Sequence, residues 1–286
     1  MKILKSQFDA SVNFVEKDLT GFIESRYVRR EKKYFNCYLS SQSGCNKGCR
    51  FCHLTATKQT TFEDITPQGF LDQAENVFSH YREETYPARF VHYSFMARGE
   101  ALANKYLLED ADSVLLPLGQ KAVKEGLNPK FNISTIMPKT LDKPLVDIFK
   151  LITPTIYYSL YSVEDDFRKK WVPAAMEVKQ ALSMLREYQL ATKKLVKIHY
   201  AFIKDENDKI IDLCRVVETL RDFQLACEFN IVRYNPFSPD QGEESDEATI
   251  KRNFEFLQQN IDGRVRIIER VGKDVSASCG MFEEKI

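Results

Sequence analysis

The sequence contains no apolar run near the roughly 20 residues that a membrane-spanning helix needs, and it has no internal repeat or low-complexity tract. These absences argue against helical membrane spans and repeat architectures. The chain also lacks net charge, because its 41 basic residues balance its 41 acidic ones. No overall positive field draws it to nucleic acid, so any contact with RNA or DNA must come from local patches.

We expect no secretory signal peptide, since residues 1–5 are charged and not apolar. Seven cysteines without such a signal indicate a reducing compartment, where thiols bind metal or react, and we therefore expect a cytoplasmic protein. Histidine is scarce. His80, His92 and His199 show no metal-pair spacing, so none of them is assigned a catalytic role.

The most informative feature that is present is a group of three cysteines, Cys45, Cys49 and Cys52. Iron–sulfur clusters that only carry electrons usually take four cysteine ligands, and no fourth cysteine lies close by. Three thiolates suit a 4Fe-4S cluster whose fourth iron stays open to a small molecule. A structural zinc site is the alternative, but zinc prefers four protein ligands and only the adjacent His53 is at hand. Glycine and asparagine around the cysteines favour a loop.

Runs rich in β-forming residues alternate with helical patterns along most of the chain. The runs cover residues 34–40, 89–95, 130–135, 155–160, 195–202, 226–232 and 264–270. Helical patterns begin at Thr66-Pro67, cover residues 175–190 and begin again at Ser245-Asp246. The alternation predicts an α/β fold with a mostly parallel sheet, closed or partly closed into a barrel. We expect a short N-terminal extension with an edge strand over residues 1–30, and a barrel domain over residues 31–286.

Several polar residues follow the ends of these runs. The cysteine group follows the first run, Gly99-Glu100 the second, Ser134 the third, Ser159 the fourth and Asn235 the sixth. Since the carboxyl ends of parallel strands meet at one edge of the sheet, we expect these residues to share one pocket.

The order of motifs resembles the RlmN/Cfr branch of the radical S-adenosylmethionine (SAM) enzymes, which methylates adenosine in RNA. The matching motifs are Ser40-Ser41-Gln42-Ser43-Gly44-Cys45, Gly99-Glu100-Ala101-Leu102-Ala103-Asn104, Ile133-Ser134-Thr135, Ser159-Leu160-Tyr161, Tyr234-Asn235-Pro236-Phe237 and Ser278-Cys279-Gly280. The resemblance implies a partial (β/α)6 radical SAM barrel that holds a 4Fe-4S cluster through Cys45, Cys49 and Cys52. It places SAM against Gly99, Glu100, Ser134, Ser159, Leu160, Tyr161 and Asn235.

The resemblance also implies a covalent carrier, because in this family a cysteine at the position of Cys279 accepts a methyl group from one SAM and passes it to C2 or C8 of adenine. A radical from a second SAM activates the S-methyl group, since both ring carbons are electrophilic. Release requires a second thiol, which forms a disulfide with Cys279, and a base, for which Glu24 matches the family position. Counting from Glu24 places Cys37 at the second thiol, whereas counting back from Ser40 places Tyr38 there.

Other positions depart from the family pattern. Ala101 replaces a proline, Tyr161 a histidine and Val271 an arginine. We also expect no counterpart of the N-terminal accessory domain that bacterial members of the family use in RNA recognition. The expected substrate is rRNA or tRNA, the expected reductant a flavodoxin or ferredoxin, and the expected state a monomer. Two alternatives stay open: an enzyme of the same branch that modifies a DNA base or a free nucleotide, and a non-enzymatic protein stabilised by zinc or a cluster.

A basic run interleaved with aromatic residues has two interpretations. It comprises Arg26, Tyr27, Arg29, Arg30, Lys32, Lys33 and Tyr34. The run suits either contact with a phosphate backbone or a solvated edge strand that its charges protect from aggregation.

Cys214 and Cys227 lie in apolar patterns, and we expect both of them in the core.

Overall fold

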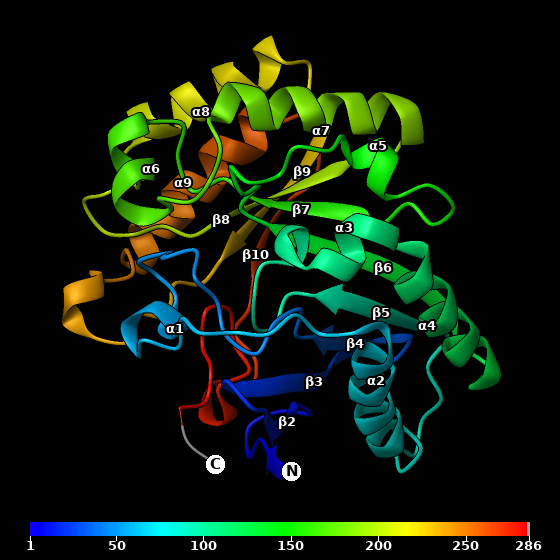
Figure 1. Ribbon diagram of the computed structural model, residues 1–286. Helices are drawn as coiled ribbons and strands as arrows, with labels where there is room; N and C mark the ends of the chain where they lie inside the picture. Colours follow the sequence, from blue (N-terminus) through cyan, green and yellow to red (C-terminus); the bar gives the residue numbers. More distant parts are fainter. Residues whose placement is uncertain (285–286) are drawn as a thin grey trace.

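A computed structural model describes residues 1–284 and joins ten strands into one sheet, ordered as they follow one another along the chain (Figure 1). The strands are β1 (Lys2–Lys5), β2 (Val12–Lys17), β3 (Phe22–Glu31), β4 (Tyr34–Leu39), β5 (Phe90–Phe95), β6 (Asn128–Thr135), β7 (Thr155–Ser159), β8 (Val196–Tyr200), β9 (Cys227–Val232) and β10 (Val265–Ile268). The pairs from β1 to β4 are antiparallel, and those from β4 to β10 are parallel.

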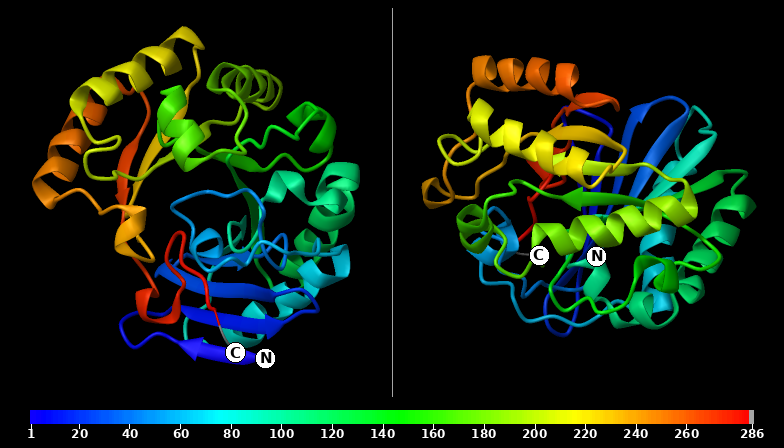
Figure 2. Two further views of the ribbon diagram at one scale, coloured as in Figure 1. Left: turned by 60° about the vertical axis from the view of Figure 1, so that its left-hand side comes forward. Right: turned by 90° about the horizontal axis from the view of Figure 1, so that it is seen from above.

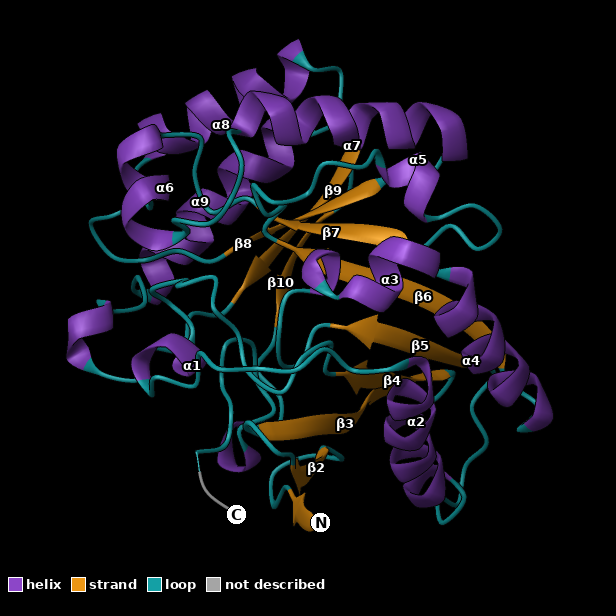
Figure 3. Ribbon diagram, viewed as in Figure 1, coloured by secondary structure: helices purple, strands orange, loops and turns teal. Residues whose placement is uncertain are grey.

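Helices fill most of the connections between the parallel strands (Figure 3). They are α1 (His53–Ala56), α2 (Pro67–Tyr81), α3 (Lys105–Asp110), α4 (Asp112–Lys124), α5 (Leu145–Ile148), α6 (Asp165–Trp171), α7 (Val178–Thr192), α8 (Ile210–Asp222) and α9 (Glu247–Asn260), with three short 3-10 turns. Figure 2 shows the sheet curved into an open ring with the longer helices outside. The expected α/β fold with a partly closed, mostly parallel barrel is confirmed, and β10 adds a seventh parallel strand.

Local sequence signals place the helix starts. The Thr66 hydroxyl accepts a hydrogen bond from the Gly69 amide at 3.1 Å, and Pro67 occupies the first turn of α2, where its missing N–H costs nothing. The Asp246 carboxylate caps α9 in the same way, by accepting from the Thr249 amide at 2.7 Å. The predicted start signals of both helices are therefore confirmed.

The N-terminal extension continues the sheet. β3 lies between β2 and β4, so the basic run is not an edge strand, and β1 is the outermost strand instead. The edge interpretation is wrong because β1 and β2 were not visible as β-rich runs. Arg26 on β3 is only 3% exposed and bonds to Glu24 at 2.7 Å. Arg30 donates to the backbone oxygen of Glu269 at 2.8 Å and so ties β3 to the chain that follows β10.

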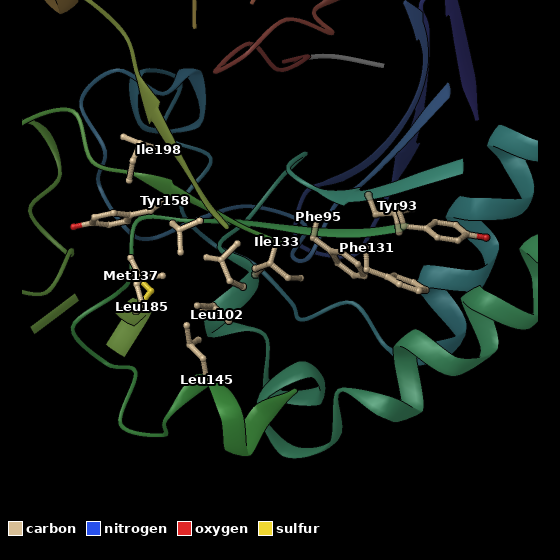
Figure 4. Packing of buried hydrophobic residues seen from close by; sticks show 14 of the residues in the cluster. Tyr93, Phe95, Leu102, Phe131, Ile133, Met137, Leu145, Tyr158, Leu185 and Ile198 are labelled. Atoms are coloured by element: carbon tan, nitrogen blue, oxygen red, sulfur yellow. The ribbon is translucent and has the colours of Figure 1, made fainter. Parts of the chain in front are cut away.

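The main apolar core lies between the sheet and the outer helices. Phe78 of α2 is fully buried against Phe35 and Tyr93, with ring centroids 6.1 Å apart in both pairs. Figure 4 shows another part of this core, with Ile133 of β6 and Leu102. Because successive side chains of a strand point to opposite faces, the other face of the same strands looks into the barrel. That inner face is polar.

Two further expectations concern cysteine burial and membrane spans. Cys227 is buried in the main core as expected, whereas Cys214 on α8 is half-buried. No helix within residues 1–284 has the length and apolar character needed to cross a membrane.

Truncating Phe78 tests the outer core. We expect Phe78→Ala to lower the free energy of unfolding by about 3–5 kcal/mol, because it leaves a cavity among buried rings. Chemical denaturation measures this. Phe8→Ala is the matched control, since Phe8 is 83% exposed, and its effect should stay within about 0.5 kcal/mol. Similar losses in both variants would contradict this view of the core.

Candidate active site

A cavity of about 540 Å³ is lined by residues of the parallel strands and of the loops that follow them. It gathers most of the residues expected at the site, from segments far apart in sequence. These are Cys45, Cys49, Cys52, Gly99, Glu100, Ser134, Ser159, Tyr161, Asn235 and Cys279. Leu160, Cys37 and Glu24 do not line it. The shared rim follows from the parallel strands, whose carboxyl ends all face one way.

The cysteine segment after β4 is a loop, as its composition indicates. A side chain at Gly44 would bring its Cβ within 2.3 Å of the Thr61 oxygen, so glycine is required there, and Gly48 has a φ of +68°, which favours glycine. The Cys45 amide donates to the Gln59 oxygen at 3.0 Å, and Cys52 stands immediately before α1. The loop therefore has a defined path that turns its cysteines toward the cavity.

The three thiols are close enough to affect one another electrostatically. Burial raises the pKa of Cys49 well above its ordinary value, and the charges of Cys45 and Cys52 raise it further. Burial likewise raises the pKa of Cys45 to about 11 and that of Cys52 to about 12. Three buried thiolates without a strong cationic partner need a positively charged centre, so this donor set fits a bound iron–sulfur cluster.

His53 does not complete a zinc site. Its Nε2 lies 3.2 Å from the Asn235 backbone oxygen, and its ring meets the edge of the Phe237 ring at 5.1 Å between centroids. Within residues 1–284, no three Cys, His, Asp or Glu side chains surround one point in the way that the ligands of a single ion do. Ligands of a cluster differ in this respect, because each binds a separate iron.

Gly99 and Glu100 form a rigid corner after β5. Gly99 has a φ of +91°, and a Cβ there would lie 2.7 Å from Gln42, so no larger residue fits. The Glu100 carboxylate accepts from the amides of Leu102 and Ile136, each at 3.1 Å. Burial raises the pKa of this carboxyl group, and these hydrogen bonds oppose the rise. Glu100 thus joins the ends of β5 and β6 at the wall of the cavity.

Cys279 reaches the cavity on the segment that follows β10. The side-chain amide of Asn235 donates to the Cys279 backbone oxygen at 3.0 Å. The backbone amide of His53 donates to the Gly280 backbone oxygen, also at 3.0 Å. Although the residue is exposed at the cavity mouth, desolvation of its sulfur raises the pKa of the thiol. The positive charge of Arg26 and a hydrogen bond from Tyr161 lower the pKa and oppose that rise.

The structure does not bring Cys37 to Cys279. Cys37 is fully buried in the main core, on the face of β4 that looks outward to the helices, and all seven cysteines are free. Tyr38, the next residue, lines the cavity instead and lies within the electrostatic reach of Cys279. The expected Cys37–Cys279 disulfide is therefore not formed. With the one-residue insertion before Ser40, the Tyr38 side chain faces the cavity and the Cys37 side chain faces the outer core.

Leu160 does not line the cavity. It is fully buried in the main core between Ser159 and Tyr161, which both line the cavity. Alternation along the chain turns the leucine away from the site. Tyr161 has a φ of +56° and stacks on Phe51 of the cysteine loop, with ring centroids 4.4 Å apart.

Glu24 does not line the cavity, and its carboxylate is paired with two arginines. Its carboxylate is fully buried and bonds to Arg26 at 2.7 Å and to Arg98 at 2.8 Å. It also accepts from Asn13 and from the Glu283 amide, each at 3.0 Å. Burial by itself would raise the pKa of Glu24, but the two guanidinium charges and the hydrogen bonds lower it below the ordinary value.

The same two arginines hold the C-terminal segment. Arg26 donates to the Met281 oxygen at 2.7 Å, and Arg98 donates to the Glu283 oxygen. We call Glu24, Arg26 and Arg98 the buried anchor. Sequence reasoning missed the role of Arg98, which comes from a different strand end than Glu24, and the only local signal was its place immediately before Gly99-Glu100.

Comparisons with known proteins agree with this geometry. The pattern of the Radical SAM superfamily matches residues 39–217. The chain is 26% identical over 288 residues to the "Probable dual-specificity RNA methyltransferase RlmN" of Clostridium botulinum (strain Eklund 17B / Type B), covering 98% of this chain and 77% of that one. It is 28% identical over 275 residues to the "Dual-specificity RNA methyltransferase RlmN" of a Nitratiruptor species, covering 92% and 71%.

A crystal structure of a radical SAM methyltransferase from Sphaerobacter thermophilus has the same fold. It aligns with a TM-score of 0.83 at 19% identity, over 98% of this chain and 80% of that one.

The raised thiol pKa values have a measurable consequence in metal-free protein. A pKa near 11 instead of 9.0 for Cys45 lowers its thiolate fraction at pH 8 about 100-fold, so iodoacetamide should react about 100-fold more slowly than in the unfolded chain. The rate should climb only as the pH approaches the raised pKa. Mass spectrometry of the alkylated peptide measures it. Equal rates in folded and unfolded protein would refute the assignment.

Neutralising Glu24 tests the buried anchor. Glu24→Gln leaves two buried guanidinium groups without their carboxylate, and we expect the free energy of unfolding to fall by about 3–5 kcal/mol. Glu75→Gln is the control, because its carboxylate forms partly exposed ion pairs that contribute at most about 1 kcal/mol.

The pH dependence of the buried anchor has a definite sign. Because the folded pKa of Glu24 is lowered, its contribution is present above the ordinary pKa and disappears as the pH falls through the lowered folded value. Denaturation at several pH values should therefore show the difference between wild type and Glu24→Gln shrinking in acid. A constant difference would contradict an ionised Glu24.

Proposed function

The chain belongs to the radical SAM superfamily and to its RlmN/Cfr-like methyltransferases, and we propose that it transfers a methyl group through Cys279 to C2 or C8 of adenosine in RNA. The observation that carries the proposal is the position of Cys279, in one cavity with Cys45, Cys49 and Cys52. The RNA substrate is supported by the relatives, which are named as RNA methyltransferases.

The superfamily uses a 4Fe-4S cluster and SAM, and the donor set described above fits the cluster. Cys45, Cys49 and Cys52 would hold it, while Gly99, Glu100, Ser134, Ser159 and Tyr161 border the space for SAM. When bound, the cluster and SAM supply the methyl group and one-electron chemistry. A protein reductant such as flavodoxin or ferredoxin would provide the electron.

The chain's own residues prepare Cys279 for methyl transfer. The thiol must lose its proton to accept a methyl group, and the Arg26 charge and the Tyr161 hydroxyl offset part of the rise in pKa that burial causes. The buried anchor holds the segment immediately after Cys279 through Met281 and Glu283. The sulfur is thereby kept at the cavity, where a substrate can meet it.

No thiol of β4 faces Cys279, so release of the product would need a thiol from solution to attack the Cys279 sulfur and form a disulfide as the carbon–sulfur bond breaks, with a base to take the ring proton. Among residues 1–284, the cysteines lining the cavity besides Cys279 are the three proposed cluster ligands. Cys37 lies behind the sheet, and Glu24 is engaged by two arginines. Tyr38 stands where the resolving thiol would face Cys279, so this chain does not supply an internal disulfide partner from β4.

Cys279→Ala tests the proposal. With reconstituted cluster, a reductant and SAM labelled in its methyl group, we expect wild-type protein to carry label on Cys279 and to transfer it to RNA. The variant should keep the iron content and absorbance of the cluster but lose transfer at least about 100-fold, as removal of a covalent nucleophile does.

Cys214→Ala is the matched control, because Cys214 lies on α8 and does not line the cavity. Label transfer by Cys279→Ala at the rate of Cys214→Ala would remove Cys279 from the reaction.

A further inference from the structure

The cavity continues inward past Cys279, toward the amino ends of the parallel strands. This inner chamber is lined by Tyr34, His92, Tyr157, Lys197, His199 and Arg266. They come from β4, β5, β7, β8 and β10, and none of them belongs to the proposed cluster or SAM site. A barrel normally fills this space with interlocking apolar side chains. Polar and aromatic groups around an open volume indicate a ligand site instead.

Two aromatic pairs line the inner chamber. Tyr34 and His92 stack with centroids 4.4 Å apart and an interplanar angle of 11°, and Tyr157 meets His199 at 4.9 Å and 72°. Burial, with the nearby charge of Lys197, lowers the pKa of His92 to about 4 and that of His199 to about 3. Both imidazoles are therefore neutral near pH 7. Flat uncharged rings beside a cavity suit a planar aromatic ligand.

The inner chamber also carries excess positive charge. Lys197 and Arg266 share one carboxylate, that of Glu228, at 3.2 and 3.0 Å. Exposed Arg264 stands at the edge of the cavity and forms no ion pair with any residue in the described range 1–284. Arg30 is also exposed at this edge, and one of its guanidinium nitrogens donates a hydrogen bond to the Glu269 backbone oxygen. Two carboxylates also line this part of the cavity, those of Glu31, which pairs with Lys33 at 3.1 Å, and of Glu269. An anionic group at this mouth would meet the cations Arg30, Arg264 and Arg266, which outnumber these two carboxylates.

Two buried polar atoms near this charge have no partner. Asn230 is 2% exposed and lines the cavity, and its Oδ1 accepts no hydrogen bond. The Nε of Arg266 donates none. The two residues are paired in register on β9 and β10, so an acceptor and a donor lie on neighbouring strands. A buried unpaired polar group is costly, and a purine edge, with its amino group and ring nitrogen, presents the complementary pattern.

The inner chamber is continuous with the reactive cysteine. Tyr38 lines the same cavity and experiences the charges of Arg30, Tyr157 and Cys279. It therefore lies between the inner chamber and the thiol.

We propose that the inner chamber binds one purine nucleotide, with its base among the aromatic pairs, its edge at Asn230 and Arg266, and its phosphate at the mouth formed by Arg30 and Arg264. The site deepens the proposed function, because it names where the substrate base lies and on which groups. The nucleotide is either free or part of an RNA chain, and the two sources share this chemistry.

Calorimetric titration of the protein with AMP, adenosine and a short single-stranded oligoadenylate tests the proposal without turnover. We expect AMP to bind at least about fivefold more tightly than adenosine, because only AMP carries the phosphate. Arg266→Gln should weaken the binding of AMP or of the oligonucleotide about tenfold, which is the effect of losing one charged donor. Lys197 still pairs with Glu228 in this variant, so the fold should persist.

Arg215→Gln is the matched control, because Arg215 also pairs with a carboxylate, Glu164 at 3.2 Å, but lies outside the cavity. If AMP binds and Arg266→Gln weakens that binding, the ligand is a free nucleotide. If the oligonucleotide binds and AMP does not, the ligand is a segment of RNA. The proposal is overturned if neither ligand binds, if adenosine binds as tightly as AMP, or if both arginine variants behave alike.

This experiment is independent of methyl transfer. If Cys279 is labelled but no nucleotide binds, the proposed nucleotide site is rejected and the proposed function stands. If a nucleotide binds but Cys279 is not labelled, the proposed function is rejected and the nucleotide site stands.

Discussion

A buried carboxylate shared by two guanidinium groups holds the C-terminal segment against the sheet, and the position of Cys279 depends on it. Glu24, Arg26 and Arg98 come from β3 and from the loop after β5, and they bond to the backbone of Met281 and Glu283. Desolvating three charges is costly, so such a group persists only when nearly every donor and acceptor is used. Here the backbone of the tail accepts from both guanidinium groups and donates to Glu24, while the Nε of Arg26 keeps no partner. The sulfur that the proposed reaction needs is thereby held by electrostatics rather than by a disulfide.

The two faces of the sheet divide the remaining roles. The outer face packs apolar side chains such as Val91 and Tyr93 against the helices, and the inner face presents polar ones such as His92 and Ser94 to the cavity. This division keeps the barrel open inside while the outer core stabilises it. Strand alternation also means that the same short segment serves both purposes, because neighbouring residues never face the same side.

Much of the site was predictable from local pattern, and the errors share one cause. The cysteine loop, the corner at Gly99 and the residues after each parallel strand could be located because each is the end of a visible β-rich run. Cys37 was assigned by counting along the chain and Leu160 by its place in a motif, yet both side chains face the core. A shift of one residue reverses the face of a strand, and alternation turns a residue away from its two neighbours. Glu24 was assigned as a base because the sequence does not show that Arg98 lies beside it.

The sequence by itself determined the α/β alternation, the cysteine chemistry and the resemblance to a methyltransferase family, since these depend on residue type and short spacing. Only the tertiary structure decided which side of β4 faces the cavity, how Glu24 is paired, and that β9 and β10 bring Asn230 beside Arg266. The physical reason is that pairing register and the contacts between distant segments are set by packing of the whole sheet, whereas local residue patterns specify only each element and its ends.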